Sequence, residues 1–457
     1  MDLTRRRLLQ RSTAIALAFG GLRLSGEEAA ADPAAGYGAL VRDPAGVIDL
    51  PAGFSYRVLS RVGDAMSDGL IVPNAADGMA AFALDGGGVA LVRNHELNHE
   101  SAEHGAFGAD FARVGRIAAD RFYDFGSGRP PGGGTTTLVL GPDGAVRSQF
   151  LSLAGTHRNC AGGATPWGTW ITCEETAVRA GGALVQRDHG YAFEVAAAAT
   201  GPVLPTPLTA MGRFNREAIA VDAASGAIYQ SEDHGDGLLY RFVPDAPGAP
   251  AKGGRLQALA VVDRDGVDTA NWKSRDFAVG ARHAVRWVDL DRPESPDDDL
   301  RHRGRRLGAA TFCRGEGMWS EGGIWLCATA GGKARKGQVW RYRPSAAEGS
   351  AAESEAPGTL ELFCEPDNGL ALENCDNITV APWGDLVLCE DQASKPEIDP
   401  GIRLVGVSPR GACYTLARNA LNTSEFAGAC FSPDGATLYV NIQSPATTLA
   451  ITGPWRG

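Results

Sequence analysis

The segment WITCEE (residues 170–175) is a short apolar stretch that ends in acidic residues, and five other segments of the chain resemble it. These are LVRNHE (91–96), IYQSED (228–233), IWLCAT (324–329), LVLCED (386–391) and LYVNIQ (438–443). A glycine stands shortly before each of the six. β-branched and aromatic residues bounded by glycine are typical of short strands. The segments therefore predict six equivalent strands in an internally repeated fold.

Further apolar segments flank each predicted strand. Those before it begin at Cys160, Glu217, Glu316, Asn377 and Cys430, and those after it at Thr135, Gly190, Gly237, Gly337, Ile402 and Thr447. Three or four antiparallel strands repeated six times predict an all-β fold, a six-bladed β-propeller with insertions between blades. The longest insertion is expected at 252–306, with its acidic run at 293–299 as a solvated loop. A pair of β-sandwiches or a barrel is the alternative.

The composition excludes several classes of protein. With 44% hydrophobic residues the chain can fill a core, so it is not disordered. The 60 glycines and 26 prolines argue against a helical bundle, because both residues break long helices. Acidic residues outnumber basic ones by 54 to 43, which excludes nucleic acid as a partner since its affinity comes mostly from basic contacts.

Residues 1–31 have the layout of an export signal. Arg5, Arg6 and Arg7 precede an apolar run at 14–22, and alanines at 29–31 suit a cleavage site. The consecutive arginines before two leucines resemble the twin-arginine signal, so the twin-arginine translocase is an expected partner. A basic tail on a cytoplasmic protein is the alternative. We expect a single mature domain at 32–457 that is monomeric, periplasmic or secreted, and without a membrane span.

Acidic residues gather at the ends of the predicted middle strands. They are Glu96, Glu174, Glu175, Glu232, Asp233, Glu390 and Asp391. Equivalent strand ends of a propeller meet at the mouth of its central channel, where neighbouring carboxylates raise one another's cost of ionisation. A hard metal ion with oxygen ligands would relieve that cost. The pattern therefore predicts a metal site.

The segments before these strands supply further candidates. Glu217, Glu316 and Asp376 add carboxylates, and Cys173 adds one soft ligand beside Glu174, which favours iron or zinc over calcium alone. The nine cysteines contain no C-x-x-C pair, which argues against a zinc ribbon. Arg314, Lys333 and Lys336 are the cations that could face the acids. Arg314 could bind a phosphate or simply pair with Glu316.

The segment His95-Glu-Leu-Asn-His99 matches the H-E-x-x-H signature of zinc proteases. That chemistry needs both histidines on one face of a helix. The preceding residues 89–94 read as a strand, so we do not expect a metalloprotease.

Six runs of residues carry a resemblance to a known family. They are RNHE (93–96), NCAGGATPWGTWITCEE (159–175), REAIAVD (216–222), RGEGMW (314–319), KGQVWRY (336–342) and ENCDNITVAPWGDLVLCED (373–391). In this order they resemble the PhoX-type alkaline phosphatases of bacteria, over most of residues 45–457. The resemblance implies a six-bladed propeller that hydrolyses phosphate monoesters with an embedded iron–calcium cluster, Fe³⁺ and Ca²⁺ joined by a bridging oxo group.

The resemblance also implies roles for single residues. Cys173 matches the cysteine that binds iron in the family, and Glu217 and Glu316 match glutamates of its metal cluster. Arg314 matches an arginine that contacts the phosphate, and Lys336 is aligned more loosely with a phosphate-contacting lysine. No counterpart is found for a tyrosine that the family places near the substrate.

These observations predict a metal-dependent phosphomonoesterase whose substrate is a small phosphate ester. Cys173, Glu217 and Glu316 are expected to hold iron. Calcium is expected to be held by some of Glu96, Glu175, Glu232, Asp233, Asp376, Glu390 and Asp391. Two alternatives stay open. One is a calcium-dependent propeller hydrolase that acts on lactones or phosphotriesters, and the other is a non-catalytic periplasmic propeller with structural calcium.

Overall fold

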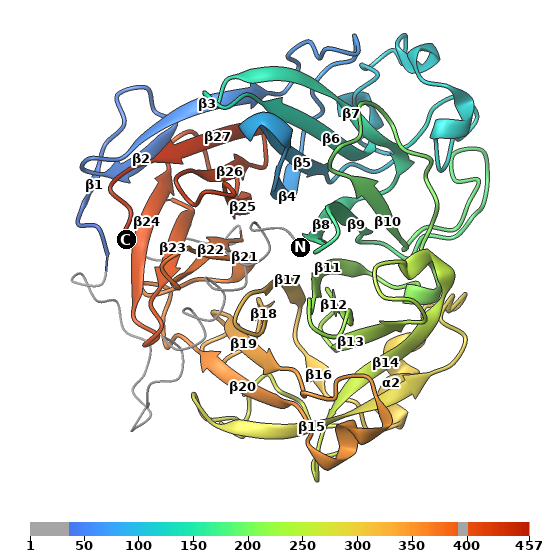
Figure 1. Ribbon diagram of the computed structural model, residues 1–457, viewed down its shortest axis with the longest axis vertical. Coiled ribbons are helices and arrows are strands. Elements are labelled where there is room, and N and C mark those ends of the chain that lie inside the picture. Colours follow the sequence, from blue (N-terminus) through green and yellow to red (C-terminus); the bar gives the residue numbers. More distant parts are fainter. Residues whose placement is uncertain (1–35, 392–400, 457) are drawn as a thin grey trace.

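The strands of the computed structural model form a ring of sheets around a central axis (Figure 1). The structure describes residues 36–391 and 401–456, so the expected export signal at 1–31 lies outside the described residues. The strands are hydrogen-bonded into five sheets, of six, three, ten, four and four strands. The prediction of an all-β, propeller-like fold is confirmed.

Six antiparallel hairpins line the axis. Their inner strands are β4 (Ala76–Ala83), β8 (Asn159–Ala164), β11 (Arg216–Val221), β17 (Gly315–Ser320), β21 (Cys375–Val380) and β25 (Phe426–Phe431). Their second strands are β5 (Val89–His95), β9 (Thr169–Glu174), β12 (Ile228–Glu232), β18 (Ile324–Ala328), β22 (Leu386–Glu390) and β26 (Leu438–Ile442). The second strands coincide with the six segments singled out in the sequence, so that prediction is confirmed.

Outer strands extend these hairpins toward the rim. The third strands are β6 (Gly133–Leu140), β10 (Ala192–Ala196), β13 (Gly237–Pro244), β19 (Gln338–Arg343), β23 (Arg403–Val407) and β27 (Thr447–Thr452). The fourth strands are β7 (Val146–Thr156), β14 (Gly254–Val261), β20 (Thr359–Cys364), β24 (Cys413–Asn419) and β3 (Ser55–Arg61). β3 pairs with β27, so a strand from the start of the chain completes the sheet formed by its end.

The remaining strands are short or peripheral. They are β1 (Leu40–Val41), β2 (Ile48–Pro51), β15 (Arg282–Leu290) and β16 (Thr311–Phe312). The helices are α2 (Leu300–Arg306) and the 3₁₀ turns η1 (Asp85–Gly87), η2 (Ala102–His104), η3 (Val114–Arg116), η4 (Ala119–Arg121), η5 (Thr209–Met211), η6 (Pro250–Lys252) and η7 (Ala351–Glu355). Within the described ranges, no helix has the length and apolar content needed to cross a membrane.

The segment 252–306 is not an insertion throughout. It contains β14, which is the fourth strand after β13, and β15, which pairs with both β14 and β20. β15 thereby joins two neighbouring groups of strands into the ten-stranded sheet. In the acidic run, Asp299 accepts from Ser295 and pairs with Arg303. Glu294, Pro296 and Asp297 are exposed but Ser295 is buried, so the run is only partly the solvated loop that the sequence predicted.

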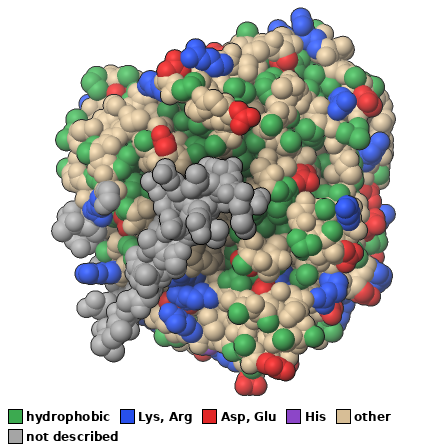
Figure 2. All heavy atoms as spheres, in the orientation of Figure 1, with side chains coloured by type: hydrophobic (Ala, Val, Ile, Leu, Met, Phe, Trp, Pro, Cys, Tyr) green, Lys and Arg blue, Asp and Glu red, His purple; other side chains and the backbone are tan. Residues whose placement is uncertain are grey.

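The core lies between neighbouring sheets. Val92 of β5 packs in one cluster with Trp170 of β9 and Phe193 of β10, all at most 2% exposed. The inner strands also contact one another around the whole ring, from β4 through β8, β11, β17 and β21 to β25 and back to β4. A few arginines are buried with this core, such as Arg216 over the ring of Phe214 and Arg241 over that of Trp287. On the surface, Figure 2 shows basic and acidic groups interspersed over one face. The ring therefore presents the starts of six inner strands to one central space.

Candidate metal centre

Each inner strand has a bulge near its start, and the bulges carry the ionisable residues of the centre. The register of all six hairpins shifts by one residue there, after a first pair such as Ala76 with His95 or Arg216 with Glu232. The bulged residues are Asp77, Cys160, Glu217, Glu316, Asp376 and Gly428. A bulge re-aims a side chain away from the normal strand alternation. Five of the six therefore bring a carboxylate or a thiol to the axis.

These side chains form three overlapping groups of potential metal ligands. In each group the ligand atoms lie within 4.8 Å of one another. The groups are Asp77, Glu96 and Cys160; Cys160, Glu175 and Glu217; and Glu217, Glu316 and Asp376. Cys160 belongs to the first two groups and Glu217 to the last two. The potential ligands therefore make one continuous cluster with both hard oxygen donors and one soft sulfur donor.

The cluster is buried and rich in carboxylates. Glu217 is 0% exposed, and both of its carboxylate oxygens lack a hydrogen-bond partner among the described residues. Burial and the neighbouring carboxylates raise the pKa of Glu217 well above its usual value. Burial together with Asp391 raises the pKa of Asp376 to about 7. Buried carboxylates without donors are the arrangement that a bound cation would satisfy, so the residues fit a metal centre.

A second, more exposed set of acids follows the second strands. Glu96, Glu175, Asp233 and Asp391 each come directly after the end of their strand, and their side chains are 18%, 7%, 14% and 24% exposed. The same backbone hydrogen bond recurs in different hairpins and fixes the position of these acids. The amide of Glu175 donates to the carbonyl of Arg158, and the amide of Asp391 donates to the carbonyl of Asn374. These four acids border the more exposed side of the centre, which we call its mouth.

The acids one residue earlier point the other way, because successive side chains of a strand alternate. Glu174 accepts from the amides of Gly190 and Tyr191 and lies 2.6 Å from Nδ1 of His189. Glu232 accepts from the hydroxyl of Tyr240 and Glu390 from the guanidinium of Arg403. The structure therefore does not bring Glu174, Glu232 and Glu390 into any of the three ligand groups.

Cys173 and Cys160 lie on adjacent strands but in different surroundings. Cys173 on β9 is packed in an apolar cluster with Ile171, Met211 and Phe242. Burial raises the pKa of its thiol to about 12 and also raises the pKa of the Cys160 thiol well above its usual value, so the pKa does not distinguish the two cysteines. Cys160, at the bulge of β8, is the cysteine of the ligand groups. The structure thus offers Cys160 where the sequence and its resemblance pointed to Cys173.

Arg314 joins three acids of the centre. Its guanidinium donates to Asp233 at 3.0 and 3.1 Å, to Asp391 at 3.0 Å and to Glu316 at 2.5 Å. Arg314 therefore pairs with Glu316, as one of the two sequence interpretations expected, and it also pairs with two acids of the mouth, Asp233 and Asp391. Lys336 pairs with Glu373 at 2.5 Å, and its backbone carbonyl accepts from the amide of Asn374, next to β21.

Several residues of the centre were not predicted. Asp77 was missed because β4 (ADGMAAFA) is rich in alanine and glycine and has no β-branched residue to mark it as a strand. Arg158 and Glu425 were also missed; burial and the nearby Asp376 and Asp391 raise the pKa of Glu425 well above its usual value, which places it beside the centre. Arg158 donates to Glu96 and Glu175, both at 2.7 Å. The sequence did contain a signal for Cys160. It is the first residue of the apolar segment before its predicted strand, as Glu217 and Glu316 are the first residues of theirs.

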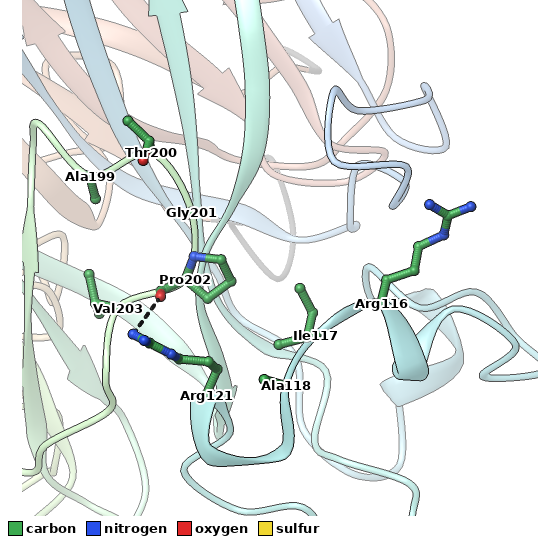
Figure 3. A pocket seen from close by; sticks show the side chains of 9 residues that line it. All are labelled: Arg116, Ile117, Ala118, Arg121, Ala199, Thr200, Gly201, Pro202 and Val203. Carbon is green, nitrogen blue, oxygen red and sulfur yellow. Dashed lines mark hydrogen bonds between the residues drawn. The ribbon is translucent and has the colours of Figure 1, made fainter.

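Two other features lie outside the centre. His95 stands on β5, where its ring lies 2.9 Å from the carbonyl of Asn74 and 2.8 Å from Thr136, so the H-E-x-x-H segment does not form the helix of a zinc protease. A surface pocket of about 420 Å³ lies near η3 and η4 (Figure 3). Arg121 donates to the carbonyl of Pro202 at its edge, and none of the potential ligands lines it.

Comparisons with known proteins identify the fold and the family of the chain. A solved structure titled "Pseudomonas fluorescens PhoX in complex with vanadate, a transition state analogue" matches with a TM-score of 0.64 and 17% identity, over 89% of this chain and 96% of that one. The gluconolactonase XC5397 from Xanthomonas campestris matches at 13% identity over 95% and 99% of the two chains, with a TM-score of only 0.37. No curated protein matches the sequence. The family model described as "Alkaline phosphatase PhoX" matches residues 35–446, and the chain therefore belongs to the PhoX alkaline phosphatase family.

Proposed function

We propose that this protein hydrolyses phosphate monoesters with an iron–calcium centre held by the bulges of its inner strands. The observation that carries the proposal is Glu217, a fully buried carboxylate that belongs to two ligand groups and whose oxygens lack a hydrogen-bond partner among the described residues. A buried carboxylate in this state calls for a cation. Membership of the PhoX alkaline phosphatase family supports phosphate esters as the substrate class.

The donor set suggests which residues hold which metal. Cys160, Glu217 and Glu316 combine one thiolate with carboxylates, which suits iron. Asp77, Glu96, Glu175 and Asp376 offer oxygen ligands, which suit calcium. Such metal ions supply a nucleophile at neutral pH and neutralise charge on a phosphoryl oxygen.

Arg314 is proposed to bind the phosphoryl group. Its guanidinium is 38% exposed and reaches into the mouth from a left-handed backbone conformation with φ of 53°. A planar guanidinium can donate two parallel hydrogen bonds to phosphate oxygens, which orients the group and stabilises its charge during transfer. Asp233 and Asp391 hold the guanidinium in this orientation. Pseudomonas fluorescens PhoX, which has a similar fold, was solved with vanadate as a transition-state analogue, and this supports phosphoryl chemistry as the reaction class.

The matched variants Cys160→Ala and Cys173→Ala test the proposed centre. Cys160→Ala removes the only sulfur donor of the ligand groups, so we expect loss of iron and of hydrolysis of p-nitrophenyl phosphate. Cys173→Ala removes a thiol packed among apolar side chains, so iron and activity should stay near the wild-type level. Elemental analysis and initial rates provide the measurements. Iron that survives Cys160→Ala, or wild-type protein without iron and without phosphatase activity, would contradict the proposal.

We also propose that the ring comprises six blades. The six bulged hairpins and the closed ring of inner-strand contacts support this count. The ten-stranded sheet would then be two blades joined at the rim by β15 and β20.

Export through the twin-arginine pathway remains part of the proposal, with a mature domain at 32–457. We expect that changing Arg5, Arg6 and Arg7 to lysine keeps the protein inside the cell, because the translocase reads the paired guanidinium groups. Cell fractionation would detect the retained protein. Undiminished export of the lysine variant would contradict this route.

A further inference from the structure

Arg158 occupies the same place in its hairpin as Arg314 does in its own. Each stands directly before its inner strand, β8 or β17, with φ of 50° and 53°. The carbonyl of Arg158 accepts from the amide of Glu175, and that of Arg314 from the amide of Thr329, both at 2.9 Å. The two side chains are 39% and 38% exposed. The bulged hairpins therefore deliver two equivalent guanidinium groups to the mouth.

The two arginines lie on one line of contacts along the mouth. Arg158 donates to Glu96 and Glu175 at 2.7 Å each. The side-chain amide of Asn215 then donates to Glu175 at 3.2 Å and to the carbonyl of Asp233 at 2.9 Å. Asp233 in turn accepts from Arg314. Only the hairpin that carries Asn215 separates the two arginines, so both border the same stretch of the mouth.

The guanidinium groups lie on the solvent side of the acids. The acids that they contact are at most 24% exposed, and the bulged residues beneath them are at most 8% exposed. A phosphate ester that approaches the centre would therefore meet the guanidinium groups before the carboxylates. Cations bound by Glu96 and Glu175 would draw these carboxylates away from Arg158 and leave its N–H donors to an anion.

We propose that Arg158 is a second phosphate-binding residue, which together with Arg314 contacts the phosphoryl oxygens of the substrate. This inference rests on the proposed function. Two guanidinium groups at the mouth select a dianionic phosphate, as in monoesters and inorganic phosphate, over singly charged diesters. Arg158 is therefore a determinant of substrate class as well as of affinity.

A purely structural role makes a different prediction. If Arg158 only positions Glu96 and Glu175, its loss should release metal ions, and phosphate affinity should fall only together with the metal content. If Arg158 contacts phosphate, the metal content should stay and the affinity should fall alone. Metal content and phosphate binding thus separate the two roles without any activity assay.

The test uses Arg158→Gln, Arg158→Lys and the control Arg418→Gln in the metal-loaded full chain. Arg418 also pairs with a buried carboxylate, that of Asp49, but it stands on β24, away from the centre. Calorimetric titration with inorganic phosphate should show a Kd raised about tenfold to a hundredfold for Arg158→Gln, at unchanged iron and calcium content. Arg158→Lys keeps the charge but not the planar fork, so a smaller rise is expected. Arg418→Gln should bind as the wild type does.

Two results would overturn the inference alone. One is a phosphate affinity that stays at the wild-type value in both Arg158 variants, and the other is an affinity that falls only in step with the metal content. If Arg158→Gln does not fold, the same criteria apply to Arg158→Lys, whose circular dichroism spectrum should match the wild type. A metal-loaded wild-type protein that neither binds phosphate nor hydrolyses its esters would instead overturn the proposed function, and this inference with it.

Discussion

His189 is a buried imidazole held between two carboxylates. Its Nδ1 lies 2.6 Å from Glu174 and its Nε2 lies 3.3 Å from Asp124, and all three side chains are 0% exposed. Burial alone would lower the pKa of His189, but Glu174 and Asp124 outweigh it and raise the pKa to about 9. His157, whose ring centroid is 5.3 Å away, has a pKa lowered to about 3 by burial and by the charge of His189. His189 is therefore the charged member of the pair at neutral pH.

The raised pKa of His189 predicts how stability depends on pH. The folded state binds the proton more tightly than the unfolded state, so this stabilisation is complete below pH 6.5 and is lost as the pH rises to about 9. The loss amounts to about 3 kcal/mol. Between pH 6 and 9.5 the free energy of unfolding should fall further in the wild type than in His189→Gln. The difference between the two falls should be about 3 kcal/mol. Urea titrations would measure it, and equal pH dependence in both proteins would refute the charge assignment.

At the scale of elements, close packing of the bulged inner strands requires a small residue directly after the potential metal ligand. Gly317 follows Glu316, and a Cβ on it would lie 2.5 Å from the backbone oxygen of Asp376. A Cβ on Gly78, which follows Asp77, would lie 2.6 Å from the Cα of Ala161. Neighbouring inner strands therefore approach so closely that a methyl group forces their backbones apart.

Gly317→Ala should destabilise the protein by about 1 to 3 kcal/mol, because the added methyl group meets backbone that cannot move freely. Gly115→Ala is the matched control, since nothing lies within 4 Å of a Cβ at that position and its φ is negative. Thermal denaturation of the two variants gives the comparison. A melting temperature that falls no further for Gly317→Ala than for Gly115→Ala would show that the inner strands are not tightly packed.

The second strands could be predicted from the sequence, but the bulges could not. Segments such as 386–391 are dense in leucine and valine, which identifies the strand whatever its partners are. A bulge leaves no comparable mark, because it depends on the register between two strands. That is why Cys173 was preferred to Cys160, and why both acids of Glu174-Glu175 were assigned to the centre although alternation admits only one. β15 was missed because its charged, partly exposed residues resemble those of a loop.

At the scale of the whole molecule, the centre unites residues from nearly the full length of the chain. Asp77 lies near its start, whereas Gln443, which donates to both Asp77 and Glu96, lies near its end. The pairing of β3 with β27 brings these parts together. The sequence indicated that the strands repeat, but no local pattern shows that the first and last of them meet. The acidic excess that excluded nucleic acid is concentrated partly in this shared centre.

Metal removal should therefore weaken the whole fold. Without cations, burial and mutual repulsion keep the pKa values of Asp77, Glu217 and Glu316 raised and that of Asp376 at about 7. These raised values mean that the folded metal-free protein binds more protons than the unfolded chain, so its stability falls as the pH rises above about 4.5. Cations bound at the proposed centre would stabilise the ionised carboxylates and remove this dependence.

We thus expect chelation to lower the melting temperature at pH 8 more than at pH 6. His189 contributes equally to the metal-loaded and the metal-free protein, so the difference between the two forms isolates the centre. Differential scanning calorimetry of both forms at the two pH values gives the four melting temperatures. Adding iron and calcium back should restore the melting temperature of the wild type but not of Glu217→Gln, which lacks the carboxylate shared by two ligand groups. A chelation effect of the same size at pH 6 and pH 8 would mean that ionised carboxylates do not couple the metals to the fold.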